Sequence, residues 1–127
     1  MEMEFREAGG ARIPKVGLGT WRVTGEECVE AVSTALELGY RHVDTAQVYE
    51  NERQVGRAIR ESDVPREEVF LTTKIDPSNR TRDEVLASVA RSLQRLDVDT
   101  IDLLLVHWPH PLADVKTTMR AMNEARD

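Results

Sequence analysis

The sequence predicts an α/β protein in which parallel β-strands alternate with α-helices. Strand-like runs of apolar and β-branched residues occur at 16–19, 40–45, 69–73 and 101–106. Each run is followed by a segment whose apolar residues recur at the three- and four-residue spacing of a helix. Strands that alternate with helices in this way pair in parallel through right-handed crossovers. The chain therefore contains four predicted strand–helix units.

The 127 residues form one domain by size, and no linker separates regions of different composition. A complete parallel (β/α) barrel of TIM type has eight units in about 250 residues. The sequence therefore predicts the first half of such a barrel, with a β-hairpin over residues 1–15 and four units over residues 16–127. The alternative is a small open α/β sheet that is complete in itself.

Turn and capping signals place the ends of several elements. Gly9-Gly10 predicts the hairpin turn, because consecutive glycines supply the positive φ values that tight turns require. Gly39 is predicted to end the first helix as its C′ residue. Three helix starts show a capping-box pattern, in which Thr or Asn is followed three residues later by Glu or Gln. These patterns are Thr24-x-x-Glu27, Asn51-x-x-Gln54 and Thr81-x-x-Glu84.

Apolar positions predict which faces are buried. The predicted helix faces are Cys28, Val32, Ala35 and Leu36, then Val55, Ala58 and Ile59, then Val85, Val89, Leu93 and Leu96. The continuous apolar run of 103–106 predicts a fourth strand that is covered on both faces. A fourth helix is expected from Asp114 onward, with Val115, Met119 and Met122 as its apolar residues.

Composition narrows the class of protein. Hydrophobic residues make up 40% of the chain and charged residues 31%, which is typical of a globular protein. The net charge of −6 disfavours a nucleic-acid partner, because phosphate binding needs clustered Lys and Arg. The single Cys28 lies in an apolar helical pattern, so we expect a buried thiol. Without a signal-like segment or an apolar run of membrane-spanning length, we expect no membrane partner and a cytoplasmic location.

Polar and aromatic side chains lie at the end of every predicted strand. They are Thr20 and Trp21, next to Gly19, at the first strand, Asp44 and Tyr49 at the second, Lys74 at the third, and His107 and Trp108 at the fourth. Parallel strands bind ligands at their carboxyl ends. Each residue alone has an ordinary structural explanation, such as a turn cap or rim packing. Their shared position favours a functional site.

A carboxylate, an ammonium, a phenol and an imidazole in one cavity suggest acid catalysis. A phenol has an ordinary pKa of about 10 and is a poor proton donor near neutrality, but a neighbouring ammonium stabilises its charged form. Lys74 can supply that charge to Tyr49, and Asp44 can hold the lysine in place. His107 could donate a hydrogen bond to a substrate oxygen. Such a set would polarise a carbonyl and deliver a proton as hydride arrives at carbon.

The sequences around these residues resemble the aldo-keto reductase family, and in particular its diketogluconate reductase-like branch. The matching segments are Gly17-Leu18-Gly19-Thr20-Trp21, His42-Val43-Asp44-Thr45-Ala46-Gln47-Val48-Tyr49, Asn51-Glu52, Thr73-Lys74 and His107-Trp108-Pro109. The resemblance spans essentially the whole chain in family order and includes the hairpin that plugs the bottom of the family's barrel. It implies reversible reduction of an aldehyde or ketone to an alcohol by NADPH or NADH, usually NADPH.

The resemblance also implies roles for individual residues. Tyr49 is implied to be the proton donor, tuned by Lys74 and Asp44. His107 is implied to orient the carbonyl. The residues implied to meet ligands are Gly19, Thr20 and Asp44 for the nicotinamide, and Trp21 and Trp108 for the carbonyl substrate. Rim packing is the alternative explanation for the two tryptophans.

The sequence departs from the family pattern in two ways. Glu50 stands where many relatives have glycine. The family holds its cofactor mainly with groups that follow strands five to eight, which lie outside these 127 residues. Gly17-x-Gly19 does not replace them, because Arg22 occupies the place of the third glycine in a dinucleotide fingerprint. We therefore expect a truncated barrel that lacks most of the cofactor site and needs a complementing second half for activity.

Two other functions remain possible from the sequence. The first is a non-enzymatic half-barrel module for binding or assembly, which would form a homodimer through its open sheet edges. The second is a metal-dependent hydrolase, which would use His107-x-x-His110 beside Asp44. The metal site is the weaker hypothesis, because no third ligand is evident and the histidine pair lies in a Pro-containing turn.

Overall fold

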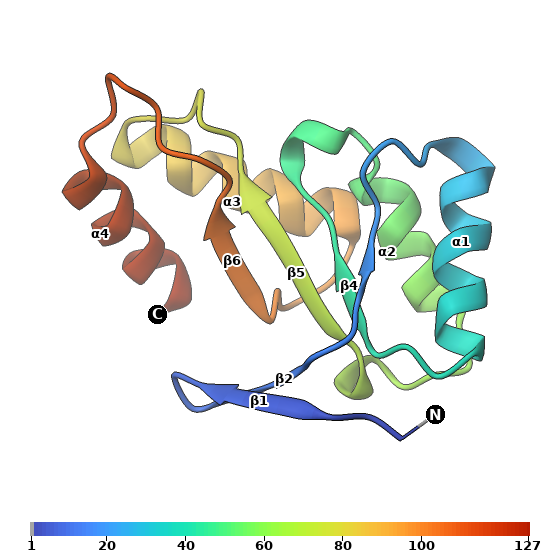
Figure 1. Cartoon of the computed structure of the whole chain (residues 1–127). Helices are drawn as coiled ribbons and strands as arrows, with labels where there is room; N and C mark the ends of the chain where they lie inside the picture. Colours follow the sequence, from blue (N-terminus) through green and yellow to red (C-terminus); the bar gives the residue numbers. More distant parts are fainter. Residues whose placement is uncertain (1) are drawn as a thin grey trace.

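The computed structural model describes residues 2–127 and shows an α/β fold with two sheets (Figure 1). Strands β1 (Phe5–Ala8) and β2 (Ala11–Pro14) form an antiparallel hairpin. Its turn consists of Gly9 and Gly10, with φ values of 57° and 81°. The predicted N-terminal hairpin is therefore confirmed.

Four parallel strands form the second sheet, in the order β3-β4-β5-β6. The strands are β3 (Leu18–Gly19), β4 (His42–Asp44), β5 (Phe70–Ile75) and β6 (Leu103–Val106). Their spatial order follows the chain, as expected for successive strand–helix units. Strand β3 has two residues, fewer than the predicted 16–19, whereas β5 extends past the predicted 69–73. Lys74 consequently lies inside β5 and does not close it.

Four helices follow one another along the sheet, and each packs against the next (Figure 1). They are α1 (Gly25–Glu37), α2 (Glu52–Glu61), α3 (Arg82–Leu96) and α4 (Val115–Arg126). Two short 3-10 helices, η1 (Gln47–Tyr49) and η2 (Arg66–Glu68), lie in the connections before α2 and β5. The alternation of strands and helices is the arrangement that the sequence predicts.

The core lies between the helices and the parallel sheet, in two clusters. The larger cluster joins α1 and α2 to β4 and β5, and its buried residues are Cys28, Val29, Val32, Leu36, Val43, Val55, Ala58, Ile59, Val69, Leu71 and Leu96. The smaller joins β5 to α3 and α4 through Ile75, Val85, Val89 and Ala121. The predicted apolar faces of the first three helices are confirmed, with Leu93 partly buried. Burial raises the pKa of the Cys28 thiol, in keeping with the expected buried cysteine.

Helices α2 and α3 meet closely at Gly56. A Cβ atom at this position would overlap the backbone carbonyl group of Leu96 at the end of α3. The Leu96 carbonyl oxygen accepts a hydrogen bond from Arg60, whose Nε lies 3.6 Å from Asp97 Oδ2. The last carbonyls of a helix have no partner within the helix. Helix α2 therefore supplies a partner at the end of α3, and glycine permits the approach.

Only one of the three predicted capping boxes forms. The Thr81 hydroxyl accepts the Glu84 N–H at 3.2 Å, and the Glu84 carboxylate accepts the Thr81 N–H at 3.0 Å. Thr24 and Asn51 occupy the N-cap positions of α1 and α2, but neither side chain caps its helix. Gly25 follows Thr24 with φ of 56°, which turns the backbone away from the usual capping geometry. The predicted helix starts are correct, and two of the predicted boxes are wrong.

Strand β6 and helix α4 are less covered than their apolar residues predict. In the described chain β6 pairs only with β5, and Leu105 is 38% exposed. On α4, Val115 and Met119 are exposed, while Thr118 and Ala121 are buried against the fold. The prediction of a strand covered on both faces is therefore wrong for this chain, because Leu104 packs against the smaller cluster on one face while Leu105 on the other face stays exposed.

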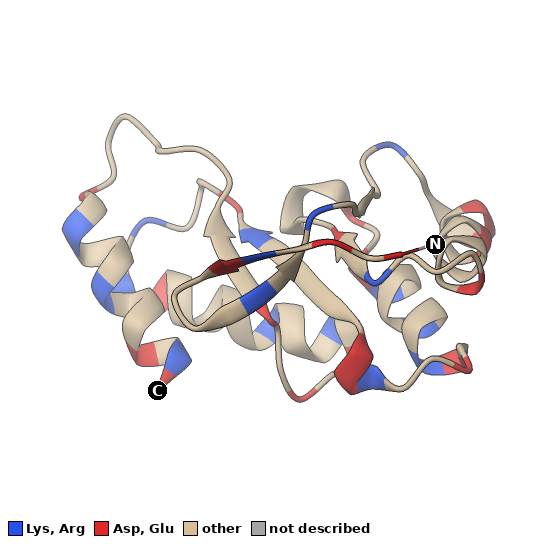
Figure 2. Cartoon of the chain, turned by 60° about the horizontal axis from the view of Figure 1, so that its bottom comes forward, with Lys and Arg blue, Asp and Glu red and all other residues tan. Residues whose placement is uncertain are grey.

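Charged residues of both signs are spread along the chain. Figure 2 shows Lys and Arg segments interleaved with Asp and Glu segments over the helices and loops. Helix α1 is the exception, because all its charged residues are acidic. Within residues 2–127, no helix combines the length and the apolar character that crossing a membrane requires.

Candidate active site

The four predicted catalytic residues gather at the carboxyl-terminal edge of the parallel sheet. Asp44 is the last residue of β4, Lys74 lies near the end of β5, and His107 directly follows β6. Tyr49 is the last residue of η1, which follows β4. The strands run in parallel, so their carboxyl ends lie at the same edge. This topology brings together residues that are far apart in the sequence.

Lys74 makes the central polar contacts of the site. Its ammonium forms an ion pair with Asp44 Oδ1 and donates a hydrogen bond to the carbonyl oxygen of Thr45 at 3.0 Å. The Lys74 side chain is 14% exposed. Its Nζ also lies 5.2 Å from the centroid of the Tyr49 ring. Water and salt screen such a sheltered charge less than a surface charge.

Aromatic rings lie on another side of Tyr49. The Tyr49 and His107 rings pack edge to face, with centroids 5.6 Å apart and an angle of 81° between their planes. Trp108 packs against His107 with a centroid distance of 4.5 Å. The backbone N–H of His107 donates to the carbonyl oxygen of Ile75 at 3.3 Å, which continues the pairing of β5 with β6. The imidazole ring itself lies between the rings of Tyr49 and Trp108, which it contacts.

The environment of His107 favours a neutral imidazole. Burial has the largest effect in lowering its pKa, and the Lys74 charge adds to it, against weaker opposing effects of Asp44 and Asp76. Its Nδ1 is buried and has no hydrogen-bond partner among the described residues. A neutral imidazole carries one N–H donor and one acceptor nitrogen. The ring can therefore offer a hydrogen bond to an oxygen that enters the site.

The residues predicted to meet ligands differ in how open they are. Gly19 borders open space, since a Cβ atom there would have no neighbour within 4 Å. Trp21 and Trp108 are 64% and 51% exposed. Thr20 is buried, and its hydroxyl donates to the Thr45 hydroxyl at 2.9 Å. Gly19 and the tryptophans are accessible to a ligand, whereas the Thr20 hydroxyl is already bonded within the protein.

Sequence reasoning missed a buried hydrogen-bond network beneath this edge. Asn51, which the sequence predicts as a helix cap, donates to the carbonyl oxygens of Thr20 at 2.7 Å and Val23 at 2.9 Å. Its Oδ1 accepts the Thr45 hydroxyl at 2.8 Å. Asn is also a common N-cap residue, so the local sequence at the start of α2 is just as compatible with a helix cap. The partners lie far away along the chain, so no local pattern could identify them.

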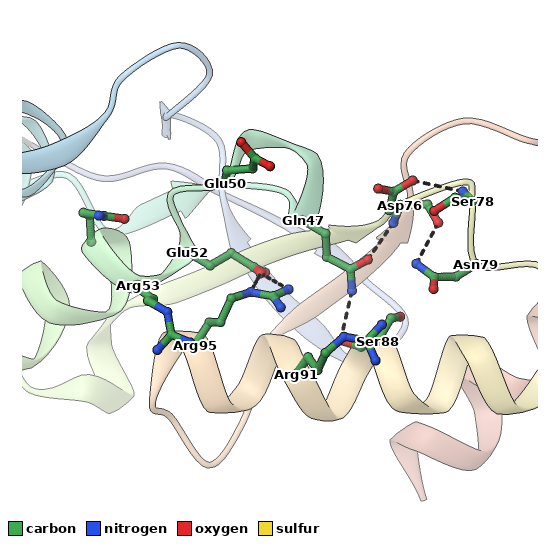
Figure 3. A pocket seen from close by; sticks show the side chains of 11 residues that line it. Gln47, Glu50, Glu52, Arg53, Asp76, Ser78, Asn79, Ser88, Arg91 and Arg95 are labelled. Carbon is green, nitrogen blue, oxygen red and sulfur yellow. Dashed lines mark hydrogen bonds and ion pairs between the residues drawn. The ribbon is translucent and has the colours of Figure 1, made fainter.

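A second buried polar group, Glu52, lines a cleft of about 440 Å³ between α2 and α3 (Figure 3). Its carboxylate accepts hydrogen bonds from Arg95 Nε at 2.8 Å and Nη2 at 2.6 Å, and from the Thr73 hydroxyl at 2.8 Å. Glu52 is 1% exposed, and a buried carboxylate requires such partners. Through Thr73, these bonds fasten the strand segment next to Lys74.

Gln47 links the Tyr49 turn to its surroundings in the same cleft (Figure 3). Its Nε2 donates to the Ser88 carbonyl oxygen at 3.2 Å and to the Ser92 hydroxyl at 3.0 Å. Its Oε1 accepts the Asp76 N–H at 2.7 Å. The polar side chains of the cleft therefore support elements that carry the predicted catalytic residues.

The metal-site hypothesis has no supporting observation in the described chain. His110 Nδ1 accepts the Leu112 N–H at 3.0 Å, which occupies one ring nitrogen. Among residues 2–127, no group of three or more His, Cys, Asp or Glu side chains could hold a metal ion.

Comparison with known proteins connects this geometry to one family. The model of the Aldo/keto reductase family matches residues 15–127. The methylglyoxal reductase DkgB of Escherichia coli O157:H7 is 49% identical over 116 residues, which cover 90% of this chain and 43% of that protein. The glycerol 2-dehydrogenase (NADP(+)) of Saccharomyces cerevisiae is 52% identical over 100 residues, which cover 79% of this chain and 31% of that protein.

Solved structures show the same architecture. A protein assigned as a 2,5-diketo-D-gluconic acid reductase B superimposes with a TM-score of 0.94 at 46% identity, covering 98% of this chain and 44% of that one. The Bombyx mori aldo-keto reductase in complex with NADP superimposes with a TM-score of 0.92 at 37% identity, covering 99% of this chain and 47% of that one. The chain spans less than half the length of these relatives. Its hairpin, its parallel units and the family model that matches almost all of it show that it belongs to the aldo-keto reductase family.

Proposed function

We propose that this chain carries the proton-donating part of a carbonyl reductase site, in which an aldehyde or ketone is reduced to an alcohol with NADPH or NADH. The observation that supports it is the Lys74–Asp44 ion pair beside the Tyr49 phenol, with His107 packed against the same ring. The names of the relatives, which include a methylglyoxal reductase, agree with a carbonyl substrate.

In this proposal, Tyr49 gives its hydroxyl proton to the carbonyl oxygen as hydride reaches the carbonyl carbon. The C=O π bond breaks, new C–H and O–H bonds form, and the tyrosine is left as a phenolate that water reprotonates. The Lys74 ammonium stabilises that phenolate through its positive charge. Asp44 keeps the ammonium in place.

His107 binds and orients the carbonyl oxygen. Its pKa is lowered, so the ring is neutral near pH 7 and donates a hydrogen bond without competing as a proton source. A donor fixed before the reaction stabilises the negative charge that develops on oxygen. Trp21 and Trp108 form the apolar walls of the substrate site, in agreement with their exposure near this edge.

The residues present fit the nicotinamide end of the cofactor. Gly19 pairs with Asp44 in the sheet and borders open space, so a flat ring can approach the backbone there. When bound, the cofactor supplies hydride to the carbonyl carbon. In this proposal Thr20 shapes the nicotinamide site through its buried hydrogen bonds. The hairpin (1–15) and the four units (16–127) act as the first half of a barrel, and a second half holds the rest of the cofactor.

Complementation tests the proposal. The chain is mixed with a separately produced second half of the E. coli methylglyoxal reductase, and NADPH oxidation is followed with methylglyoxal as the probe. We expect oxidation only in the mixture, and a loss of roughly 10²- to 10⁴-fold for Tyr49→Phe. Tyr40→Phe, which alters the chain's other tyrosine, is the matched control and should retain the rate. A folded complex in which Tyr49→Phe reacts as fast as the unmodified chain would refute the assignment.

A non-enzymatic assembly module is the second candidate. It is favoured by the exposure of Leu105, Val115 and Met119 along β6 and α4, and by the open edges β3 and β6 of the described sheet. In this case the chain forms a homodimer through its edges. Sedimentation equilibrium should then show a mass that rises with concentration, and a folded monomer at all concentrations would reject the module.

A further inference from the structure

The loop that follows β3 has a backbone that needs support. It carries Trp21 and Arg22, and Arg22 has φ of 65°, a left-handed conformation that is uncommon for a residue with a side chain. Within the loop, the Val23 N–H donates to the Thr20 carbonyl oxygen at 3.2 Å. Conformations of this kind persist when surrounding contacts enforce them.

Asn51 supplies such contacts. Its two amide hydrogen bonds reach the carbonyl oxygens of Thr20 and Val23, which stand on either side of Trp21 and Arg22. The amide therefore bridges the base of the loop. Asn51 is 1% exposed, so water cannot replace these bonds without opening the structure.

The same side chain also reaches the catalytic end of β4. Asn51 Oδ1 accepts the Thr45 hydroxyl, and Thr45 accepts the Thr20 hydroxyl. The carbonyl oxygen of Thr45 is one of the two acceptors of the Lys74 ammonium. One buried network thus joins the Trp21 loop to the residue that follows Asp44.

We propose that Asn51 is a positioning residue, which sets the Trp21 loop relative to the Asp44–Lys74 pair through its buried amide. This role rests on the proposed carbonyl reductase site, because it concerns the distance between the substrate wall and the proton source. It explains why the Asn51 side chain leaves its own helix uncapped. The interaction with the loop takes the place of the cap.

The test is an NMR comparison of Asn51→Ala with the unmodified chain. The chain has two tryptophans, so the indole N–H signal of Trp21 reports the loop and that of Trp108 serves as an internal control. We expect the Trp21 signal to move or broaden and the Trp108 signal to stay. Loss of the two buried bonds should raise amide exchange at Thr20 and Val23 by roughly tenfold.

Glu52→Gln is the matched control. Glu52 is the next residue, is equally buried and also bonds across the fold, but toward Thr73 and Arg95. The Glu52→Gln variant should raise amide hydrogen exchange around β5 and α3 and leave the Trp21 signal in place. If Asn51→Ala does not fold, the isosteric Thr45→Val breaks the same network from the other side and should move the Trp21 signal.

The outcomes separate this inference from the proposed reaction. A Trp21 signal that is unchanged in a folded Asn51 or Thr45 variant overturns the positioning role. So does a change that Asn51→Ala and Glu52→Gln share equally. Neither measurement needs cofactor or substrate, so an inactive complementation mixture would count against the reductase alone.

Discussion

The ammonium of Lys74 is held in place before any ligand arrives. Two oxygens accept its hydrogen bonds. They are Oδ1 of Asp44, the last residue of β4, and the carbonyl oxygen of Thr45, the next residue. The side chain therefore has little freedom, and its charge lies at a fixed distance from the Tyr49 ring. Charges that are fixed in advance lose little energy to reorganisation during a reaction. At the scale of single residues, the site is organised around this lysine.

The lowered pKa of His107, which packs against Tyr49, predicts that the stability of the fold depends on pH. The folded chain lowers the pKa of His107, so the unfolded chain takes up this proton at the higher pH. The stability that comes from the neutral His107 is present above the pKa of histidine in the unfolded chain, about 6.5, and is lost as the pH falls below that value. Urea unfolding should therefore show a weaker dependence between about pH 7.5 and pH 5.5 for His107→Gln than for the unmodified chain.

His110→Gln is the control for this measurement. His110 lies three residues further on, in the loop after β6. It should retain the pH dependence of the unmodified chain. If both histidine variants show the unmodified slope, the stability does not depend on the protonation of His107.

At the scale of elements, the beginning of α2 connects more of the fold than its length suggests. Asn51 reaches the loop after β3, and Glu52 reaches β5 and α3. One turn further, Gly56 lies against the end of α3. The beginning of the helix therefore connects the loop that carries Trp21 with the strand that carries Lys74.

Gly56→Ala tests the close approach of α2 and α3. The added methyl group would overlap the Leu96 carbonyl, which belongs to the backbone and cannot rotate away. We expect the free energy of unfolding to fall by about 3 kcal/mol, the upper part of the range for overpacking. Chemical denaturation measures this free energy.

Gly19→Ala is the control. A Cβ atom there has no neighbour within 4 Å, so the substitution should change stability by less than about 1 kcal/mol. Equal stability of the two variants would contradict the packing argument.

At the scale of the whole molecule, the parallel sheet of the described chain ends in two open edges. Strand β3 is short, whereas β6 exposes Leu105, and helix α4, which follows it in the chain, exposes Val115 and Met119. Open edges with apolar side chains pair readily with other chains. Both a second barrel half and a second copy of the chain would satisfy this edge.

Leu105→Lys tests whether the β6 edge drives association. A charge on an edge strand opposes pairing, so the variant should lower any concentration-dependent mass in sedimentation equilibrium. It should also weaken binding of the complementing second half. Leu112→Lys is the control, because Leu112 is more exposed but lies in the loop after β6. Association that Leu105→Lys leaves unchanged would show that another surface is responsible.

Local patterns were sufficient for the elements and for the candidate residues. Apolar spacing predicts α3 and its buried Val85 and Leu96, and Thr81 marks its start, because these features depend on neighbours within a few residues. The order of strands and helices predicts the parallel sheet, since short right-handed crossovers leave few other topologies. Asp44, Lys74 and His107 then fall at one edge through the topology alone.

Contacts between distant residues were decided only in three dimensions. The sequence around Asn51 is compatible with a helix cap, yet its amide bonds the loop after β3. The apolar run of β6 is compatible with a covered strand, yet its exposure depends on whether another element packs beside it. By itself, the sequence determined the strand–helix order and the chemistry available at the strand ends. The tertiary structure decided which partner each buried polar group takes, because hydrogen bonds between remote segments leave no periodic signal in the chain.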